Sequence, residues 1–378
     1  MTAASRLRQV WIIARLEMRR AFFSKRALWV YLLALFPAVI FIGNAVDVLV
    51  KRSRWTAVGT TPAAVLDSVR KGDVAELMLS RTGKPIEDRV WTTGGRTWRT
   101  LETAGRRGQR NFERREVFQR SVRWRLLAFF DGTRRFDFTF KNGLLDSKRS
   151  RPLADLANDR GVFAGVFQLF YLRLGIFFGC LGIFMNLFRG EMLDKTLHFW
   201  LLAPVRREVL LAGKYLAGLV AASVIFTLGA LLCFAAMLWP QDPAQVQMYL
   251  HEQALPHALW YAASALLACV GYGSFFVASG LLVRNPIIPA AVLLLWENIA
   301  GFLPSMLQKL SVLHYVQALC PVAVPTDPDM PAILRLFFAP AAPPSAPAAI
   351  TGVLVLTGLV LWLASRVIRK IEINYSTE

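Results

Sequence analysis

The sequence predicts a polytopic α-helical membrane protein with six transmembrane helices and one α+β module inserted between the first two. Hydrophobic residues make up 55% of the 378 residues and the mean hydropathy is +0.42, which is too apolar for an ordinary soluble enzyme. Six apolar runs are long enough, or nearly so, to cross a bilayer core, which takes roughly 20 residues per helix. One long polar segment, residues 51–160, separates the first run from the second.

The first apolar run is predicted to be an uncleaved membrane helix. Seven Lys and Arg precede it in residues 1–27, and the run is too long for the core of a signal peptide. The predicted transmembrane segments are 28–50, 162–188, 211–239, 258–283, 286–307 and 349–366.

The basic residues orient these helices with both termini on the cytoplasmic side, because short cytoplasmic loops collect Lys and Arg. Sixteen Lys and Arg fall on that side, in 1–27, in 189–214, at Arg284 and from Arg366 onward. The segments 240–257 and 308–348 on the other side hold two. This asymmetry accounts for a basic chain of net charge +19 without nucleic-acid binding.

Residues 1–27 are predicted to form an amphipathic helix on the cytoplasmic membrane surface. Basic residues such as Arg8, Arg15 and Arg19 lie largely off its apolar stripe, which suits a membrane interface. The alternative is a plain positively charged flank with no surface role. The stripe consists of Leu7, Val10, Ala14, Met18, Ala21 and Phe22.

Residues 51–160 are predicted to form an extracytoplasmic module, because loops this long escape the charge bias of short ones. Two short helices are expected within 62–85. The stretch 136–145 alternates Phe with polar residues and contains Asn142-Gly143, which is typical of a hairpin turn; Asp131-Gly132 is a second turn candidate.

The middle of this segment is harder to interpret. Residues 90–98 are predicted to form another hairpin around Gly94-Gly95, and the very basic stretch 104–125 a loop or an exposed helix. The order of two helices followed by aromatic strands resembles the small SmpA/BamE-like envelope domains, which pair two helices with a three-stranded sheet.

Four polar residues lie in or next to apolar runs and mark a possible substrate path: Asp47, Arg173, Glu297 and Asn298. An ionisable group inside a bilayer must face protein, water or a partner charge. Glu297 has the alternative of an internal hydrogen bond to a neighbouring helix. Arg173 has the alternative of extending outward to the membrane surface, and Asp47 that of an interfacial position.

The remaining regions carry less information. Residues 308–348 are expected to form an extracytoplasmic loop with a short re-entrant or surface helix at 331–338, and residues 367–378 a cytoplasmic tail. No two of the four cysteines form a C-x-x-C pair, so packing is their expected role and no metal site is expected.

A charged segment, RGEMLDKTLHFWLLAPVRREVLLAGK, occupies residues 189–214 between two apolar runs. Its leucines recur at helical spacing, which predicts a short amphipathic helix that Pro204 ends or kinks. The segment resembles the pattern E-x-x-x-x-T-L-x-x-L-L-x-x-P-x-x-R-x-x-x-L-x-G-K of ABC-2 type permeases. The matching residues are Glu191, Thr196, Leu197, Leu201, Leu202, Pro204, Arg207, Leu211, Gly213 and Lys214.

The resemblance implies the fold of ABC-2 (type V) exporters, in which the cytoplasmic loop 189–210 is a coupling helix that docks on a separate ATPase subunit. Its apolar side chains suit a knob for a groove, and its charged ones a polar rim. The alternative is that Glu191, Arg206 and Arg207 pair within the loop and with lipid head groups. The expected ATPase-coupling residues are Glu191, Thr196, Leu197, Leu201, Leu202, Pro204, Arg206, Arg207 and Lys214.

The resemblance also implies two ABC ATPase subunits per complex, a second permease copy or a related permease, contact with membrane lipids, and export across a bacterial inner membrane. The chain itself lacks a G-x-x-x-x-G-K-[ST] motif, so ATP and Mg²⁺ are expected in the partner ATPase and no cofactor in this chain. The four histidines are scattered and form no hydrolase or zinc pattern, so no catalytic residue is expected.

A second function class stays open from the sequence. The large insert is compatible with a membrane scaffold that works with an ATPase and envelope partners through residues 51–160 and transmits mechanical work instead of exporting a substrate.

Overall fold

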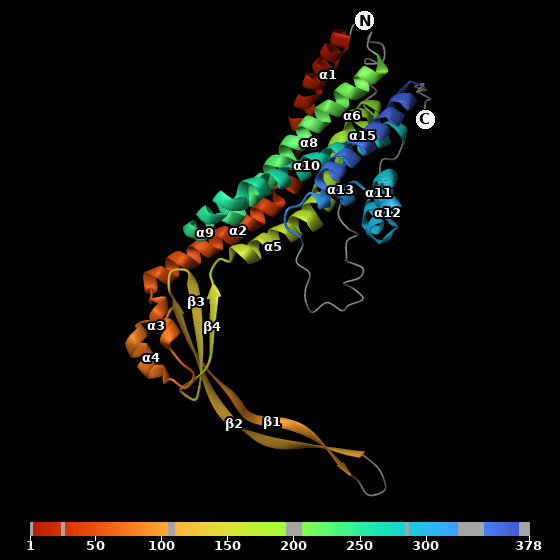
Figure 1. The fold of residues 1–378 in the computed structure, drawn as a ribbon. Helices are drawn as coiled ribbons and strands as arrows, with labels where there is room; N and C mark the ends of the chain where they lie inside the picture. Colours follow the sequence, from red (N-terminus) through yellow and green to blue (C-terminus); the bar gives the residue numbers. More distant parts are fainter. Residues whose placement is uncertain are drawn as a thin grey trace. The chain divides into compact units, whose positions relative to one another are not determined.

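The computed structural model describes residues 3–23, 27–104, 110–193, 206–283, 287–323 and 344–369. The chain divides into two compact units (Figure 1). The helical unit comprises Met1–Ala45 and Leu156–Glu378, and the second unit, the inserted module, comprises Val46–Asp155.

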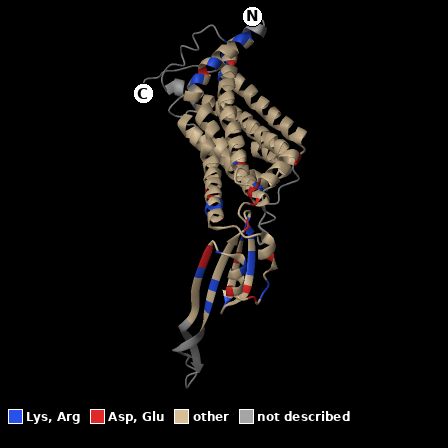
Figure 2. Ribbon diagram, turned by 90° about the vertical axis from the view of Figure 1, so that its left-hand side faces the viewer, with Lys and Arg blue, Asp and Glu red and all other residues tan. Residues whose placement is uncertain are grey.

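The helical unit is built from long helices whose charged residues gather toward their ends (Figure 2). In Figure 1 the start of α1 and the end of α15 lie at the same end of this unit. Its elements are α1 (Ala3–Phe23), α2 (Ala27–Val58, of which the residues from Val46 belong to the module), α5 (Leu156–Gly165), η1 (Val166–Gly175), α6 (Ile176–Leu193), α8 (Arg207–Leu238), α9 (Pro243–Tyr249), η2 (Leu250–Ala254), α10 (Leu255–Leu282), α11 (Ile287–Ile299), η3 (Ala300–Phe302), α12 (Ser305–Gln308), α13 (Val312–Ala318) and α15 (Ala346–Ile368).

Five helical stretches in the described part of the chain are long and apolar enough to cross a membrane, and each overlaps most of a predicted span. They are Ala27–Val58, Leu156–Met185, Arg207–Leu238, Pro243–Leu282 and Ala346–Ile368. Part of the segment 240–257 between two predicted spans is helical, since α9 and η2 continue directly into α10. Pro243 lies in the first turn of α9, where proline is tolerated, and Pro256 follows the π-helical stretch η2 directly.

The predicted span 286–307 differs from the others. It contains α11, which has 13 residues, followed by η3 and α12. A helix of that length is about 20 Å long, which is less than the roughly 30 Å core of a bilayer. A sixth spanning helix therefore stays a prediction. The predicted helix at 331–338 lies outside the described residues, as does the tail after residue 369.

The core of the helical unit lies where α6, α8 and α10 pack together. Aromatic side chains fill it and meet edge to face, as Phe177 does with Tyr272 and Phe276, at ring-centroid distances of 5.5 and 5.1 Å. Cys180, Cys233 and Cys269 are buried in this unit as free thiols, in agreement with the packing role expected of them.

The module is an α+β unit with two short helices, α3 (Ala63–Ser68) and α4 (Ala75–Thr82), and one antiparallel sheet in the order β1-β2-β3-β4. The strands are β1 (Glu87–Ala104), β2 (Arg110–Phe130), β3 (Arg134–Lys141) and β4 (Leu144–Pro152). The predicted alternation in β3 is confirmed, because Phe136, Phe138 and Phe140 are all buried. They form one core with residues of both helices and neighbouring strands: Leu66, Ala75, Met78, Leu127, Phe129 and Leu145.

The predicted turn at Asn142-Gly143 connects β3 and β4, with both residues at positive φ (51° and 89°), as a tight hairpin requires. The predicted hairpin at 90–98 was wrong. Gly94 lies instead at a register shift inside β1, so the chain continues as a strand. Residues 110–125 are likewise strand and not helix, and they pair with residues 90–104 of β1 across one register shift. The sheet has four strands, and the likeness to SmpA/BamE-like domains stays a prediction.

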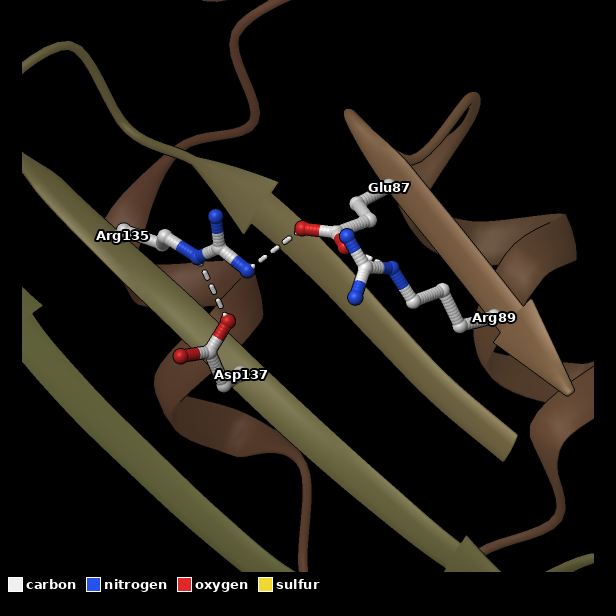
Figure 3. Close-up of polar contacts among 4 residues, drawn as sticks. All are labelled: Glu87, Arg89, Arg135 and Asp137. Carbon is white, nitrogen blue, oxygen red and sulfur yellow. Dashed lines mark hydrogen bonds and ion pairs between the residues drawn. The ribbon is translucent and has the colours of Figure 1, made fainter. Parts of the chain in front are cut away.

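The sheet face opposite the phenylalanines carries a polar cluster (Figure 3). Arg135 donates to Glu87 and to Asp137, each at 2.7 Å, and Glu87 also pairs with Arg89. The guanidinium of Arg135 lies over the ring of Trp55, 5.4 Å from its centroid. Since Trp55 belongs to α2, this cluster attaches the end of that helix to the sheet within the module.

Candidate functional site

The charged segment that carries the family resemblance is described at its two ends. Residues 194–205, which include Thr196, Leu197, Leu201, Leu202 and Pro204, lie outside the described residues. Glu191 lies in the last turn of α6. Arg206 is exposed at the start of α8, whereas Arg207 and Lys214 make contacts inside the helical unit.

Lys214 is completely buried and connects three helices. Its Nζ donates to Glu17 Oε1 of α1 at 2.9 Å and to the Leu187 carbonyl of α6 at 2.8 Å. Glu17 is 3% exposed, so the pair is shielded from solvent. A buried Lys is stable only with such partners. Lys214 therefore holds together α6 and α8, the helices in which the charged segment begins and ends. Its side chain is not on a surface that an ATPase can contact.

The predicted surface helix at 1–27 is helical over Ala3–Phe23 and packs on α8. Ile13 and Val10 of α1 contact Val209 and Leu210. Gly213 allows this close approach, because a Cβ there would lie 2.8 Å from Ile13 Cβ and 3.1 Å from the Val10 carbonyl oxygen. Of the predicted stripe, Ala14 is buried and Leu7 is 70% exposed. Contact of α1 with a membrane stays a prediction.

Arg207 attaches the start of α8 to the end of α15. Its Nη1 donates to the carbonyls of Ile368 and Arg369 at 3.3 and 3.1 Å, which satisfies acceptors that the helix end leaves open. Next to it, Glu208 forms an ion pair with Arg369. The sequence shows no signal for these contacts, since the partners are far apart in the chain.

A second polar cluster lies within the helical unit, where η1 is a π-helical stretch. Three of its side chains form hydrogen bonds to other parts of the unit, namely α8, α11 and the segment after α13. Gln168 donates to the Val322 carbonyl at 2.8 Å, and Tyr171 to the Phe226 carbonyl at 2.7 Å. Arg173 Nη1 donates to Asn298 Oδ1 of α11 at 3.3 Å. The structure thus brings together two residues of the predicted substrate path.

Glu297, next to Asn298, is 4% exposed and already has hydrogen-bond donors. Its carboxylate accepts from the Ser311 hydroxyl and from the backbone N–H groups of Val312 and Leu313, the last two at 3.0 and 3.2 Å. A carboxylate at the start of a helix satisfies open N–H groups there. The internal hydrogen bond that the sequence left open as an alternative is therefore present, between α11 and α13.

Asp47 makes a different contact. It lies in the module and pairs with Lys51 one helical turn later at 2.6 Å, with both side chains about half exposed. The described part of the chain contains no group of His, Cys, Asp and Glu that could hold a metal ion.

One family model matches the chain over residues 11–319, and its description is ABC-2 family transporter protein. The match includes the charged segment, the π-helical stretch and the module. No curated protein matches the chain.

Proposed function

Because the chain belongs to the ABC-2 family of transporter proteins, we propose that it is the membrane-spanning permease of an exporter driven by a separate ATPase bound to segment 189–214. A permease of this family is a transport component and not itself a catalyst. In the proposal, ATP and Mg²⁺ bind to the ATPase, two ATPase subunits serve two permease copies in a bacterial inner membrane, and the termini are cytoplasmic.

The observation that supports this most directly is the junction at Lys214. The helices on both sides of residues 194–205 meet there, and α1 is bound to the same point. Arg207 also connects α15 to this junction, because it donates to the carbonyls at the end of α15. A force applied to the charged segment would therefore act on four helices together, which is what a separate motor subunit requires of its docking segment.

The first experiment is a pull-down of the tagged chain from its native membrane in mild detergent. We expect a P-loop ATPase in near one-to-one ratio, identified by mass spectrometry. Arg206→Ala combined with Glu191→Ala should reduce its recovery at least several-fold. Arg206 is preferred over Arg207 because it is exposed, whereas Arg207 holds α15.

Arg366→Ala is the matched control, since it removes an exposed cation on α15 that stacks on Trp362. Equal recovery of the ATPase with the double variant and with this control would contradict docking on the segment. The proposal also includes a substrate path beside Arg173, Glu297 and Asn298. In it, Glu297 fixes the position of α13 through its hydrogen bonds to the start of that helix.

A second candidate function rests on the module, which has its own hydrophobic core. A scaffold that transmits force to an envelope partner would need such an independent unit. Envelope proteins recovered in the pull-down, together with loss of that recovery on deleting the module, would favour the scaffold over the exporter.

A further inference from the structure

Arg173 is a cation with few partners in an apolar environment. It lies about midway between Leu156 and Leu193, the ends of the continuous stretch α5–η1–α6. The hydrogen bond to Asn298 is long at 3.3 Å, and Nε is buried with no hydrogen-bond partner. No carboxylate of the described residues forms an ion pair with it. Charged groups at this depth are costly unless they meet a counter-charge.

The nearest acid, Glu297, interacts with Arg173 electrostatically but forms no ion pair with it. The carboxylate oxygens of Glu297 accept hydrogen bonds from Ser311 and from the backbone N–H groups at the start of α13. The side chain of Asn298 is also fixed, since its Nδ2 donates to the Leu294 carbonyl at 2.7 Å and leaves Oδ1 for Arg173. Tyr272, within electrostatic range of both Arg173 and Glu297, is buried and its hydroxyl has no hydrogen-bond partner. The Nε–H of Arg173 and the hydroxyl of Tyr272 are therefore both buried without a hydrogen-bond partner.

The surroundings of this site are apolar and open to the outside of the single chain. Asn298 is exposed, and so are Leu295 and Ile299 on the same helix. On η1, Leu169 is exposed about one turn before Arg173. A half-buried cation flanked by exposed aliphatic side chains matches a molecule that carries an anion and hydrocarbon together.

The backbone also holds Arg173 in place. A π-helical stretch is rare and is frequent at functional sites. Here two hydrogen bonds attach the π-helical stretch to its surroundings, from Gln168 to the Val322 carbonyl and from Tyr171 to the Phe226 carbonyl. Arg173 thus lies on a backbone stretch that two hydrogen bonds attach to neighbouring parts of the helical unit, and its planar fork is suited to the oxygens of a phosphate.

We propose that Arg173, positioned by its hydrogen bond to Asn298, binds the phosphate of an anionic amphiphile, and that such amphiphiles are the substrate class of this permease. The assignment of a substrate rests on the proposed transport function, but the binding itself does not. A lipid head group at the depth of Arg173 would be passing between the two leaflets. The exposed aliphatic side chains would then contact the hydrocarbon chains of that lipid.

The test measures lipid binding to the purified full chain by native mass spectrometry, with dioleoyl phosphatidylglycerol and dioleoyl phosphatidylcholine as probes. The wild type should retain phosphatidylglycerol preferentially. Arg173→Gln should weaken that binding by about tenfold to a hundredfold, the range for losing a hydrogen bond to a charged group. Arg173→Lys should lie between, because it keeps the charge and loses the fork.

Arg366→Gln is the control, since it removes an exposed cation near the end of α15, and it should leave the preference unchanged. Arg173→Lys also serves where the Gln variant does not fold. Inorganic phosphate is added as a competitor: displacement would show that the free anion suffices, and persistence that the hydrocarbon is required.

Three results would overturn the proposal. One is equal binding of the two lipids to the wild type, and another is undiminished phosphatidylglycerol binding by Arg173→Gln. The third is loss of self-association in Arg173→Gln with lipid binding retained. That result would assign the face around Arg173 to contact with a second copy of the chain. Because no ATPase is present, failure here is distinct from failure of ATPase docking.

Discussion

The buried pair of Glu17 and Lys214 permits a quantitative prediction. Lys214→Met keeps the length of the side chain but removes both hydrogen bonds, to Glu17 and to the Leu187 carbonyl. Removing one member of a buried ion pair costs about 3–5 kcal/mol, because the remaining charge stays desolvated. We expect about 3 kcal/mol, the lower end of that range, since Glu17 has further contacts.

The double variant Glu17→Leu with Lys214→Met should recover most of the loss. An apolar pair of similar volume often replaces a buried ion pair at no cost, so the remaining deficit is about 1 kcal/mol for the lost bond to Leu187. The assay is reversible unfolding in mixed detergent and SDS micelles, which gives a free energy of unfolding for each variant. A double variant as unstable as Lys214→Met, or a single variant within 1 kcal/mol of wild type, would refute this account of the junction.

Three further predictions concern other parts of the structure. Gly213→Ala should destabilise the helical unit by about 1–3 kcal/mol through overpacking against Ile13, measured by thermal melting, whereas Gly358→Ala, with open space around it, should not. Phe138→Ala should cost the module about 3–5 kcal/mol and make it protease-sensitive while the elution profile of the chain is unchanged; equal protease resistance would contradict the assigned core. The hydrogen bond from Arg125 holds the pKa of Asp88 below its ordinary value of 3.8, so the pair stabilises the module above about pH 4 and this contribution is lost as the pH falls through the lowered pKa. The stability of the module is followed by tryptophan fluorescence as the pH is lowered. Arg125→Gln should make it depend less on pH in the acid range, and an unchanged acid profile would show that the pair does not contribute.

Much of this fold is readable from local patterns. Apolar length alone locates the five helical stretches that can cross a membrane, and Asn142-Gly143 locates a turn, because both signals depend on residues adjacent in the chain. Gly94-Gly95 was misread for the same reason. A glycine pair permits a turn and a bulge equally, and only pairing with β2, whose residues follow later in the chain, decides between them.

The polar contacts of the candidate sites were less predictable. Glu17 and Lys214 are separated by 197 positions, so no local pattern relates them. One signal was present: Glu17 is the only acidic residue in 1–27, and it lies one turn after Ile13, on the face that packs on α8. Glu297 was recognised as unusual, but its role depends on the chain turning back after α11 so that the start of α13 reaches it.

The Lys214 junction and the polar cluster around Arg173 both involve the helical stretch of η1 and α6, which has a consequence for transport. Leu187, which binds Lys214, and Arg173, which binds Asn298, are 14 positions apart along η1 and α6, or about 20 Å at 1.5 Å per residue. A displacement of the charged segment therefore reaches Arg173 along one continuous helix, without crossing a loop. Because η1 is wound more loosely than an α-helix, a change toward regular α geometry would rotate Arg173 relative to Leu187. Movement at the Lys214 junction and the orientation of the Arg173 guanidinium are for that reason expected to change together.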